Sequence, residues 1–116
     1  GTGILPTATV RITHEGKTLQ QAAWGDGPVD ACYTAISKAL GITPELEQYT
    51  IRAVTGSSEA LGEVVLRIRC DGKAYVGRGL STDIVEASGR AYISAINHMT
   101  LAARSAGGPD AGEKKS

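Results

Sequence analysis

The stretch ATVRITHEGKTLQQAAWGDGPVDACYTAISKAL, residues 8–40, recurs in diverged form as VVLRIRCDGKAYVGRGLSTDIVEASGRAYISAI, residues 64–96. The two stretches align at a constant offset of 56 residues without a gap, and eight of the 33 aligned pairs are identical. Unrelated segments of ordinary composition would share about two identities. One structural unit therefore occurs twice, which predicts pseudo-twofold packing and paired sites. The identical pairs fall at a turn, at a helix start and along one helix face: Arg11/Arg67, Ile12/Ile68, Gly16/Gly72, Lys17/Lys73, Val29/Val85, Ala31/Ala87, Ala35/Ala91 and Ala39/Ala95.

The first copy predicts a hairpin followed by a helix. Alternating apolar residues indicate a strand over Thr7–His14, a tight turn at Glu15 and Gly16, and a returning strand over Lys17–Trp24. A helix follows, because Pro28 suits its first turn and Gly41 suits its C-cap. Between these two residues, apolar side chains recur with helical period at Val29, Cys32, Tyr33, Ile36 and Leu40.

The second copy predicts one strand more. A strand at about Tyr49–Val54 and a polar loop at Thr55–Ala60 precede the strand Leu61–Cys70. Asp71 and Gly72 form the second hairpin turn, and Lys73–Leu80 returns.

A second helix starts after Ser81-Thr82-Asp83, where Asp83 and Glu86 resemble a capping box. One stripe of this helix consists of Val85, Ser88, Tyr92, Ile96 and Met99. We expect its small-residue face, formed by Ala87, Ala91 and Ala95, to leave apolar surface that one chain does not cover.

These elements predict an α+β fold of two pseudo-symmetric βββα units, with antiparallel sheets and helices on one face. The first strand of unit one is missing or N-terminal, at Gly3–Pro6 at most. We expect residues 1–6 to be a cloning scar or linker, residues 7–102 to be the folded domain and residues 103–116 to be a disordered tail.

Composition narrows the class of protein. Twelve basic and twelve acidic residues cancel, which argues against nucleic acid and anionic membranes as partners. No apolar run is long enough to cross a bilayer, and Gly1–Pro6 lacks the pattern of a signal peptide. Cys32 and Cys70 are interpreted as free thiols of a cytoplasmic protein. Aromatic residues are scarce, so Trp24 is expected to anchor the core or an interface rather than stack on a ligand.

Catalytic and metal sites are not predicted. His14 and His98 stand apart, and no nucleophile elbow, zinc-protease or phosphate-loop motif is present. The sequence indicates no metal site and no cofactor, because His, Cys and carboxylates do not cluster with ligand spacing. Arg67, Arg69, Lys73 and Arg78 alternate along strands, which is typical of a solvated sheet face.

The string GDGPVDA, Gly25–Ala31, is the best candidate for a binding site. Two glycines run into a proline-started helix and expose backbone amides, which attract a carboxylate or a phosphate. Asp26 and Asp30 beside them could hold an ammonium group, so the string suits an α-amino acid. Gly27 is expected to need a backbone conformation that only glycine adopts easily. The alternative is an ordinary turn with a helix cap.

The equivalent string LSTDIVEA, Leu80–Ala87, offers acidic residues at the second helix start. Plain N-capping explains this string when it is taken alone. The presence of acids at the same helical turn in both copies makes a twin site more credible.

The strings GDGPVDACYTAI, YTIRAVTGSSEALGEV and GRGLSTDIVEASGRAYISAIN closely resemble the C-terminal regulatory domain of α-isopropylmalate synthases, over about Ala8–Leu101. The matching domain of citramalate synthases is the relative most easily confused with it. The resemblance implies two βββα units, a homodimer, a catalytic domain as partner and feedback inhibition of leucine biosynthesis by the end-product amino acid. Leucine is the ligand in the first family, and isoleucine is typical of the second.

The resemblance also implies ligand contacts at three places. They lie at the first helix start, on the strand leading out of the first helix and at the second helix start. The corresponding residues are Gly25, Asp26, Gly27, Pro28, Val29 and Ala31, then Leu46, Tyr49 and Ala53, then Thr82, Asp83 and Ile84. Leu46, Tyr49, Ala53 and Ile84 would form the aliphatic pocket. The residues of the catalytic barrel are absent from this chain, so the chain itself is not expected to be an enzyme. The rival interpretation is a purely structural dimerisation module, with a small enzyme and an RNA-binding domain less favoured.

Overall fold

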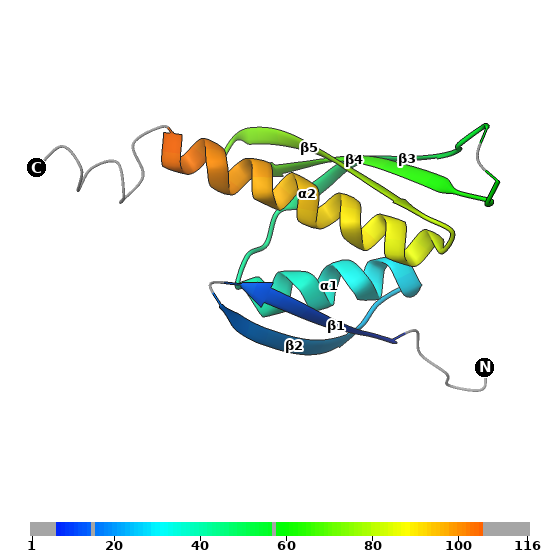
Figure 1. Ribbon diagram of the computed structural model, residues 1–116. Helices are drawn as coiled ribbons and strands as arrows, with labels where there is room; N and C mark the ends of the chain where they lie inside the picture. Colours follow the sequence, from blue (N-terminus) through cyan, green and yellow to red (C-terminus); the bar gives the residue numbers. More distant parts are fainter. Residues whose placement is uncertain (1–6, 15, 57, 106–116) are drawn as a thin grey trace, which may run out of the picture.

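The structure is a computed structural model that describes residues 7–14, 16–56 and 58–105 (Figure 1). The predicted α+β class is confirmed, as a ββα unit followed by a βββα unit. The strand expected at Gly3–Pro6 lies outside the described residues. The elements in chain order are β1 (Thr7–His14), β2 (Lys17–Trp24), α1 (Pro28–Leu40), β3 (Glu45–Ala53), β4 (Gly62–Cys70), β5 (Lys73–Ser81) and α2 (Ile84–Ser105).

The two helices lie between two antiparallel sheets (Figure 1). Helix α1 packs on the two-stranded sheet β1-β2, α2 packs on β4 and β5, and the helices contact each other. Strand β3 is an edge strand of the sheet β3-β4-β5, and among the described elements its backbone contacts β4 but neither helix. As a result its side chains Leu46 and Ile51 remain 41% and 51% exposed.

The internal repeat is reproduced in the backbone. His14 pairs with Lys17 in the first hairpin, and Cys70 pairs with Lys73 in the second, at the same offset as in the sequence. Gly72 has φ +80°, a left-handed conformation that suits glycine at a hairpin turn. The two helices begin at equivalent residues as well, Pro28 and Ile84.

The core is built mainly by the second unit. Alternate residues of β4, Val64, Leu66 and Ile68, are fully buried beneath the helices. Burying a side chain of this size is worth about 1.5–3 kcal/mol. Tyr33 and Ile36 of α1 close the core from the other side.

The expected exposure of the alanine face of α2 is wrong. Ala87, Ala91 and Ala95 have no exposed surface. They lie directly on the backbone of β5, where a Cβ atom at Gly77 or Gly79 would collide with main-chain atoms of α2. Glycines in the strand thus let the helix approach closely, and this face is not available for self-association.

Three further predictions need correction. Trp24 is not a core residue, because 71% of its surface is exposed. The strand expected to begin near Tyr49 begins at Glu45, and an irregularity between Leu46 and Gln48 interrupts its alternation. Helix α2 continues through Ser105, past the boundary expected near residue 103, since Ala102 and Ala103 are strong helix formers.

Candidate ligand-binding site

Both helix starts lie at the same end of the molecule (Figure 1). The helices run side by side in the same direction, and Cys32 of α1 faces Gly89 of α2. A Cβ atom at Gly89 would lie 3.1 Å from the Cys32 sulfur. The repeat therefore brings the Gly25–Ala31 string and the Thr82–Ile84 string to one end, as paired sites require.

The start of α1 leaves its backbone open. Gly27 is the N-cap residue and provides no side-chain cap, and Pro28 follows it. The Asp30 carboxylate accepts a hydrogen bond from the Asp26 amide at 2.9 Å and holds the preceding loop in place. Among the residues that the structure describes, no side chain caps the amides of Val29 and Asp30, which makes this helix end attractive to an anion.

The expectation for Gly27 is wrong, and the constrained glycine is Gly25. Gly27 has φ −160° and ψ 175°, an extended conformation open to any residue, and a Cβ atom there would meet nothing within 4 Å. At Gly25 a Cβ atom would collide with the backbone amide of Ala31 and with Asp30. The GDGP string needs its first glycine for packing, whereas its second leaves space above the open amides.

The start of α2 satisfies its own backbone. The Asp83 carboxylate accepts the amides of Val85 and Glu86, at 2.8 and 3.1 Å, as N-capping predicts. Ser81 accepts the Asp83 amide at 3.1 Å. The expected capping box is only half formed, because the Glu86 carboxylate pairs with Arg90 instead of reaching back.

The remaining predicted contact residues are split between separate hollows. Ala53, Thr82 and Ile84 line one hollow of about 330 Å³ with Ile51 and Leu61. Leu46 lies near the opposite end of β3 and lines a second hollow, of about 550 Å³, whose walls include Asp30, Tyr33 and Tyr92.

Tyr49 lies between these ends of β3. Its hydroxyl is hydrogen bonded to Ser88 of α2 at 2.6 Å. The structure thus brings Ala53, Thr82 and Ile84 together and sets Leu46 apart from them.

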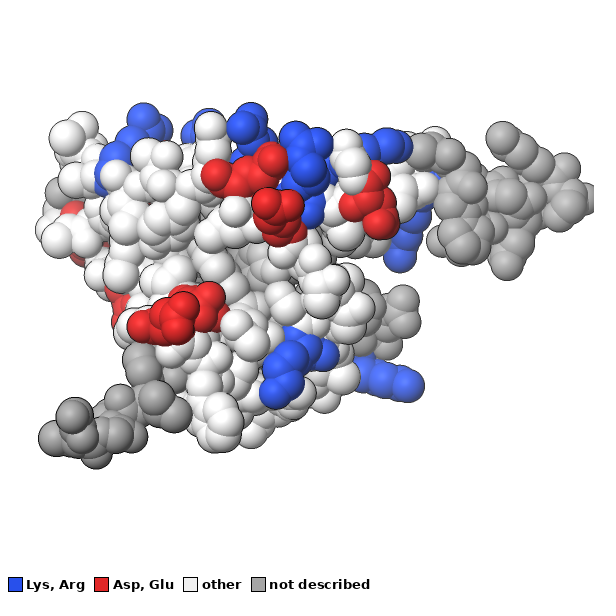
Figure 2. All heavy atoms as spheres, turned by 180° about the vertical axis from the view of Figure 1, so that it is seen from behind, with Lys and Arg blue, Asp and Glu red and all other residues white. Residues whose placement is uncertain are grey.

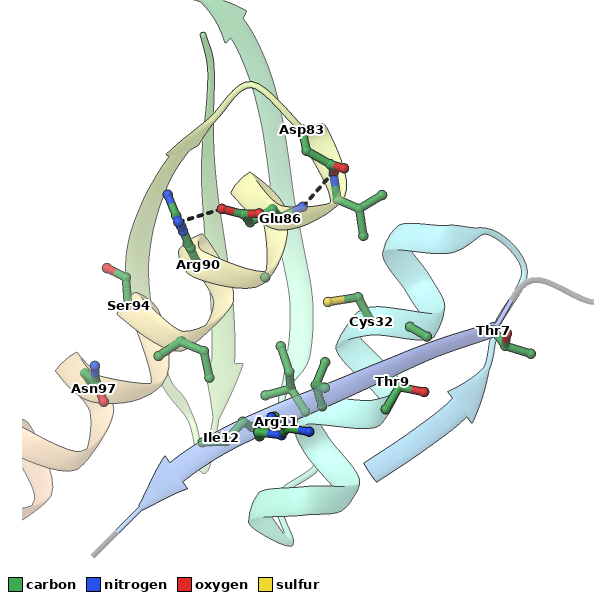
Figure 3. Close-up of a pocket in the computed structure, with 16 residues that line it drawn as sticks. Thr7, Thr9, Arg11, Ile12, Cys32, Asp83, Glu86, Arg90, Ser94 and Asn97 are labelled. Atoms are coloured by element: carbon green, nitrogen blue, oxygen red, sulfur yellow. Dashed lines mark hydrogen bonds and ion pairs between the residues drawn. The ribbon is translucent and has the colours of Figure 1, made fainter. Parts of the chain in front are cut away.

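A groove of about 690 Å³ between β1, α1 and α2 was not anticipated from the sequence (Figure 3). The apolar part of its lining includes Val10 and Ile12 from β1, Ile36 from α1 and Val85 and Ile93 from α2. The charged residues Asp83, Glu86 and Arg90 lie along its α2 side (Figure 3). The sequence does carry one signal for it, the glycine at position 89, which removes a side chain from the face of α2 that lines the groove.

Charge is distributed unevenly over the surface. On the face shown in Figure 2, basic and acidic side chains interleave along the β3-β4-β5 sheet, and an acidic patch lies at the end where α1 begins. On the sheet, Glu47 pairs with Arg67 and Arg69. At the start of α1, Asp26 and Asp30 lie next to each other and would attract an ammonium group.

Three groups in the interior, Cys32, Tyr33 and Tyr92, have raised pKa values. Burial raises the pKa of the Cys32 thiol. Burial also raises the pKa of the Tyr92 phenol, although its hydrogen bond with Ser37 opposes the shift. For Tyr33, burial and the neighbouring Tyr49 raise the phenol pKa, and the nearby Ser88 hydroxyl opposes them. These groups can pack and donate hydrogen bonds at neutral pH.

In residues 7–14, 16–56 and 58–105, no three His, Cys, Asp or Glu residues are grouped so that they could hold a metal ion. Within the same ranges, neither helix has the length and apolar character needed to cross a membrane.

Comparison with known families decides the assignment. Residues 1–100 match the family model described as LeuA allosteric (dimerisation) domain. The chain belongs to this family. The match confirms the resemblance to regulatory domains of 2-isopropylmalate synthases that the sequence strings indicated.

Similar proteins agree with the family match. The chain is 56% identical over 100 residues to a 2-isopropylmalate synthase of Carboxydothermus hydrogenoformans, covering 85% of this chain and 20% of that protein. It is 49% identical over 98 residues to the synthase of Pyrococcus furiosus, covering 84% of this chain and 20% of that protein. For a synthase of Thermus thermophilus, the identity is 50% over 100 residues, covering 85% of this chain and 30% of that protein. The LeuA domain thus spans a fifth to a third of these relatives.

Proposed function

We propose that this LeuA domain binds a branched-chain amino acid, leucine first, and transmits feedback inhibition to the catalytic domain of a 2-isopropylmalate synthase. The observation that carries the proposal is the open start of α1. It offers uncapped amides beside carboxylates, and it lies at the same end of the molecule as the start of α2, where Ile84 lines an aliphatic hollow. An α-amino acid presents the complementary groups: a carboxylate, an ammonium and an aliphatic side chain.

Each part of the ligand has a proposed partner. The ligand carboxylate accepts the amides of Val29 and Asp30 above Gly27, where the space is open. The ammonium faces the carboxylate of Asp26, which lies beside Asp30 at the start of α1. The aliphatic side chain contacts Ile84 of α2 or Tyr49 of β3. Leucine and isoleucine differ by one methyl position, worth only about 1–3 kcal/mol in a pocket, so isoleucine is the alternative ligand.

We further propose that the domain works as a homodimer in the cytoplasm and has a regulatory rather than a catalytic role. The name of the family supports self-association. So does the exposed apolar surface, which includes Trp24, Ile51 and Leu101. A stable interface typically buries about 1,600 Å². The helix face Ala87–Ala95 is excluded from that interface because it is already buried.

Isothermal titration calorimetry of the 116-residue chain with leucine, isoleucine and valine tests the ligand, with D-leucine as a control. At a hundredfold excess over its dissociation constant, the bound amino acid should stabilise the fold by about 2.7 kcal/mol, visible as a higher melting temperature. If no amino acid produces heat or a thermal shift at millimolar concentration, the chain is a structural dimerisation module. Light scattering at tens of micromolar, with and without leucine, tests the dimer; a monomer mass in both conditions contradicts it.

A further inference from the structure

Five hydroxyl-bearing side chains meet where the two repeats join. Tyr33 and Ser37 come from α1, Ser88 and Tyr92 from α2, and Tyr49 from β3. The Tyr33 ring packs between the other two rings, with its centroid 4.6 Å from that of Tyr92 and 6.5 Å from that of Tyr49. The Ser37 and Tyr92 hydroxyls are hydrogen bonded at 2.7 Å, and this bond links the two helices. We call this group the hydroxyl seam.

Ser88 is the centre of the hydroxyl seam. Its side chain is fully buried, and its hydroxyl donates to the carbonyl of Ile84 at 2.7 Å. Because that proton is engaged, the Tyr49 phenol is the donor in the 2.6 Å bond with Ser88. A serine oxygen has two lone pairs, yet with Tyr49 bound the Tyr33 hydroxyl does not donate to the second one.

Tyr33 is the residue of the hydroxyl seam whose hydroxyl lacks a hydrogen bond among the described residues. Tyr33 is 8% exposed, and its hydroxyl is buried without a partner of hydrogen-bond geometry among the residues that the structure describes. The Ser88 hydroxyl is a neighbour of the Tyr33 phenol and acts to lower its pKa. A buried hydroxyl without a partner costs about 1–3 kcal/mol. A rearrangement that gives the Tyr33 hydroxyl an acceptor would recover part of this free energy.

We propose that Ser88 is a switch point between the repeats: it accepts from Tyr49 in the arrangement described here and from Tyr33 when Tyr49 is drawn away. The first bond lies within the second repeat, joining β3 to α2. The second bond would join α1 to α2, so the exchange tightens the contact between the repeats. The trigger rests on the proposed function, because Tyr49 is one of the residues expected to contact the amino acid. Ligand binding then acts by favouring one of two arrangements.

A double-mutant cycle tests the exchange without any ligand. In the wild-type chain, Tyr33→Phe removes a hydroxyl without a partner, so the unfolding constant in urea should stay the same or fall. In the Tyr49→Phe background, Tyr33 has moved onto Ser88, so Tyr33→Phe should raise the unfolding constant about fivefold. Tyr75→Phe on β5 is the matched control and should have the same effect in both backgrounds. An equal effect of Tyr33→Phe in both backgrounds overturns the switch.

Fluorine NMR of the chain labelled with fluorotyrosine tests the trigger, with leucine as the probe. The four tyrosines give four signals, assigned by single Tyr→Phe variants. Leucine should shift the signals of Tyr33 and Tyr49 and leave that of Tyr75 unchanged. If calorimetry detects leucine but the Tyr33 signal stays in place, the switch is overturned and the proposed function stands. If leucine does not bind, the proposed function fails. The difference between the effects of Tyr33→Phe in the two backgrounds then supports or overturns the switch by itself.

Discussion

At the start of α2, the Asp83 carboxylate accepts two backbone amides, whereas at the start of α1 the equivalent residue is Gly27, which caps none. The two sites occupy the same place in a duplicated unit, so they differ in their residues but not in their position in the fold. One copy uses its side chains to complete its own helix, and the other leaves the same amides open. Divergence of this kind is expected when one copy binds a ligand and the other maintains the fold. The two copies should therefore respond differently to equivalent substitutions.

The largest effect is expected at Gly77 of β5. A side chain at this position collides with the backbone of α2, so Gly77→Val should destabilise the chain by about 3 kcal/mol or more. The equivalent position in the first repeat already carries a side chain, Gln21, and Gln21→Val should change stability by less than about 1 kcal/mol. Urea denaturation of both variants measures the difference. Equal losses would mean that the two helices pack on their sheets in the same way.

The next effect separates the two glycines of the GDGP string. Gly25→Val places a side chain against the backbone of Ala31 and should cost about 1–3 kcal/mol. Gly27→Val meets open space in an extended backbone, so the fold should remain intact. Its side chain would, however, stand over the amides of Val29 and Asp30 and weaken leucine binding. Thermal melts and calorimetry on the pair check both statements; normal leucine affinity of a folded Gly27→Val chain would move the site elsewhere.

Smaller effects are expected from the aspartates of the two helix starts. Asp83→Ala removes a cap that serves two amides and should cost about 1 kcal/mol of stability, with little effect on leucine binding. Asp26→Ala removes no cap and should weaken leucine binding more than it lowers stability. Asp83→Asn retains an acceptor oxygen and is the matched control for Asp83→Ala. Paired titrations and denaturation curves decide the assignment, and the reverse order would exchange the roles of the two starts.

The sequence predicted those features that depend on neighbours along the chain. Local turn and capping signals predicted both hairpins, both helix starts and the Gly41 C-cap, where φ is +68°. The N-capping role of Asp83 was also readable, because a cap acts within three residues of its own position. Each of these is a local matter of turn chemistry and helical period.

The features that were missed depend on distant contacts. The alanine face of α2 is buried because glycines lie opposite it on β5, and periodicity along one helix cannot report its partner. The unpartnered hydroxyl of Tyr33 likewise results from rings contributed by three separate elements. The start of β3 was placed too late because its irregularity at Leu46 and Gln48 hides the alternation.

The smallest predicted effect concerns the charges of the two hairpins. Arg67 and Arg69 of β4 pair with Glu47 of β3, whereas the equivalent Arg11 of β1 is hydrogen bonded only to the neutral Gln20 in the described residues. The hydrogen bond from Arg69 holds the pKa of the Glu47 carboxyl below its ordinary value. A lowered carboxyl pKa in the folded state stabilises the fold above the unfolded-state pKa, and this contribution is lost as the pH falls through the folded-state pKa.

Glu47→Gln should therefore lower stability slightly at neutral pH and leave it unchanged in acid, where the wild-type carboxyl is protonated as well. Because Glu47 is exposed, salt should screen the interaction and bring the wild type and the variant together. Arg11→Gln in the first repeat is the matched control, and its effect should not vary across the acid range. Melting temperatures of the three chains against pH, at low and high salt, measure these effects. A Glu47→Gln effect that persists in acid would show that the residue acts through packing rather than charge.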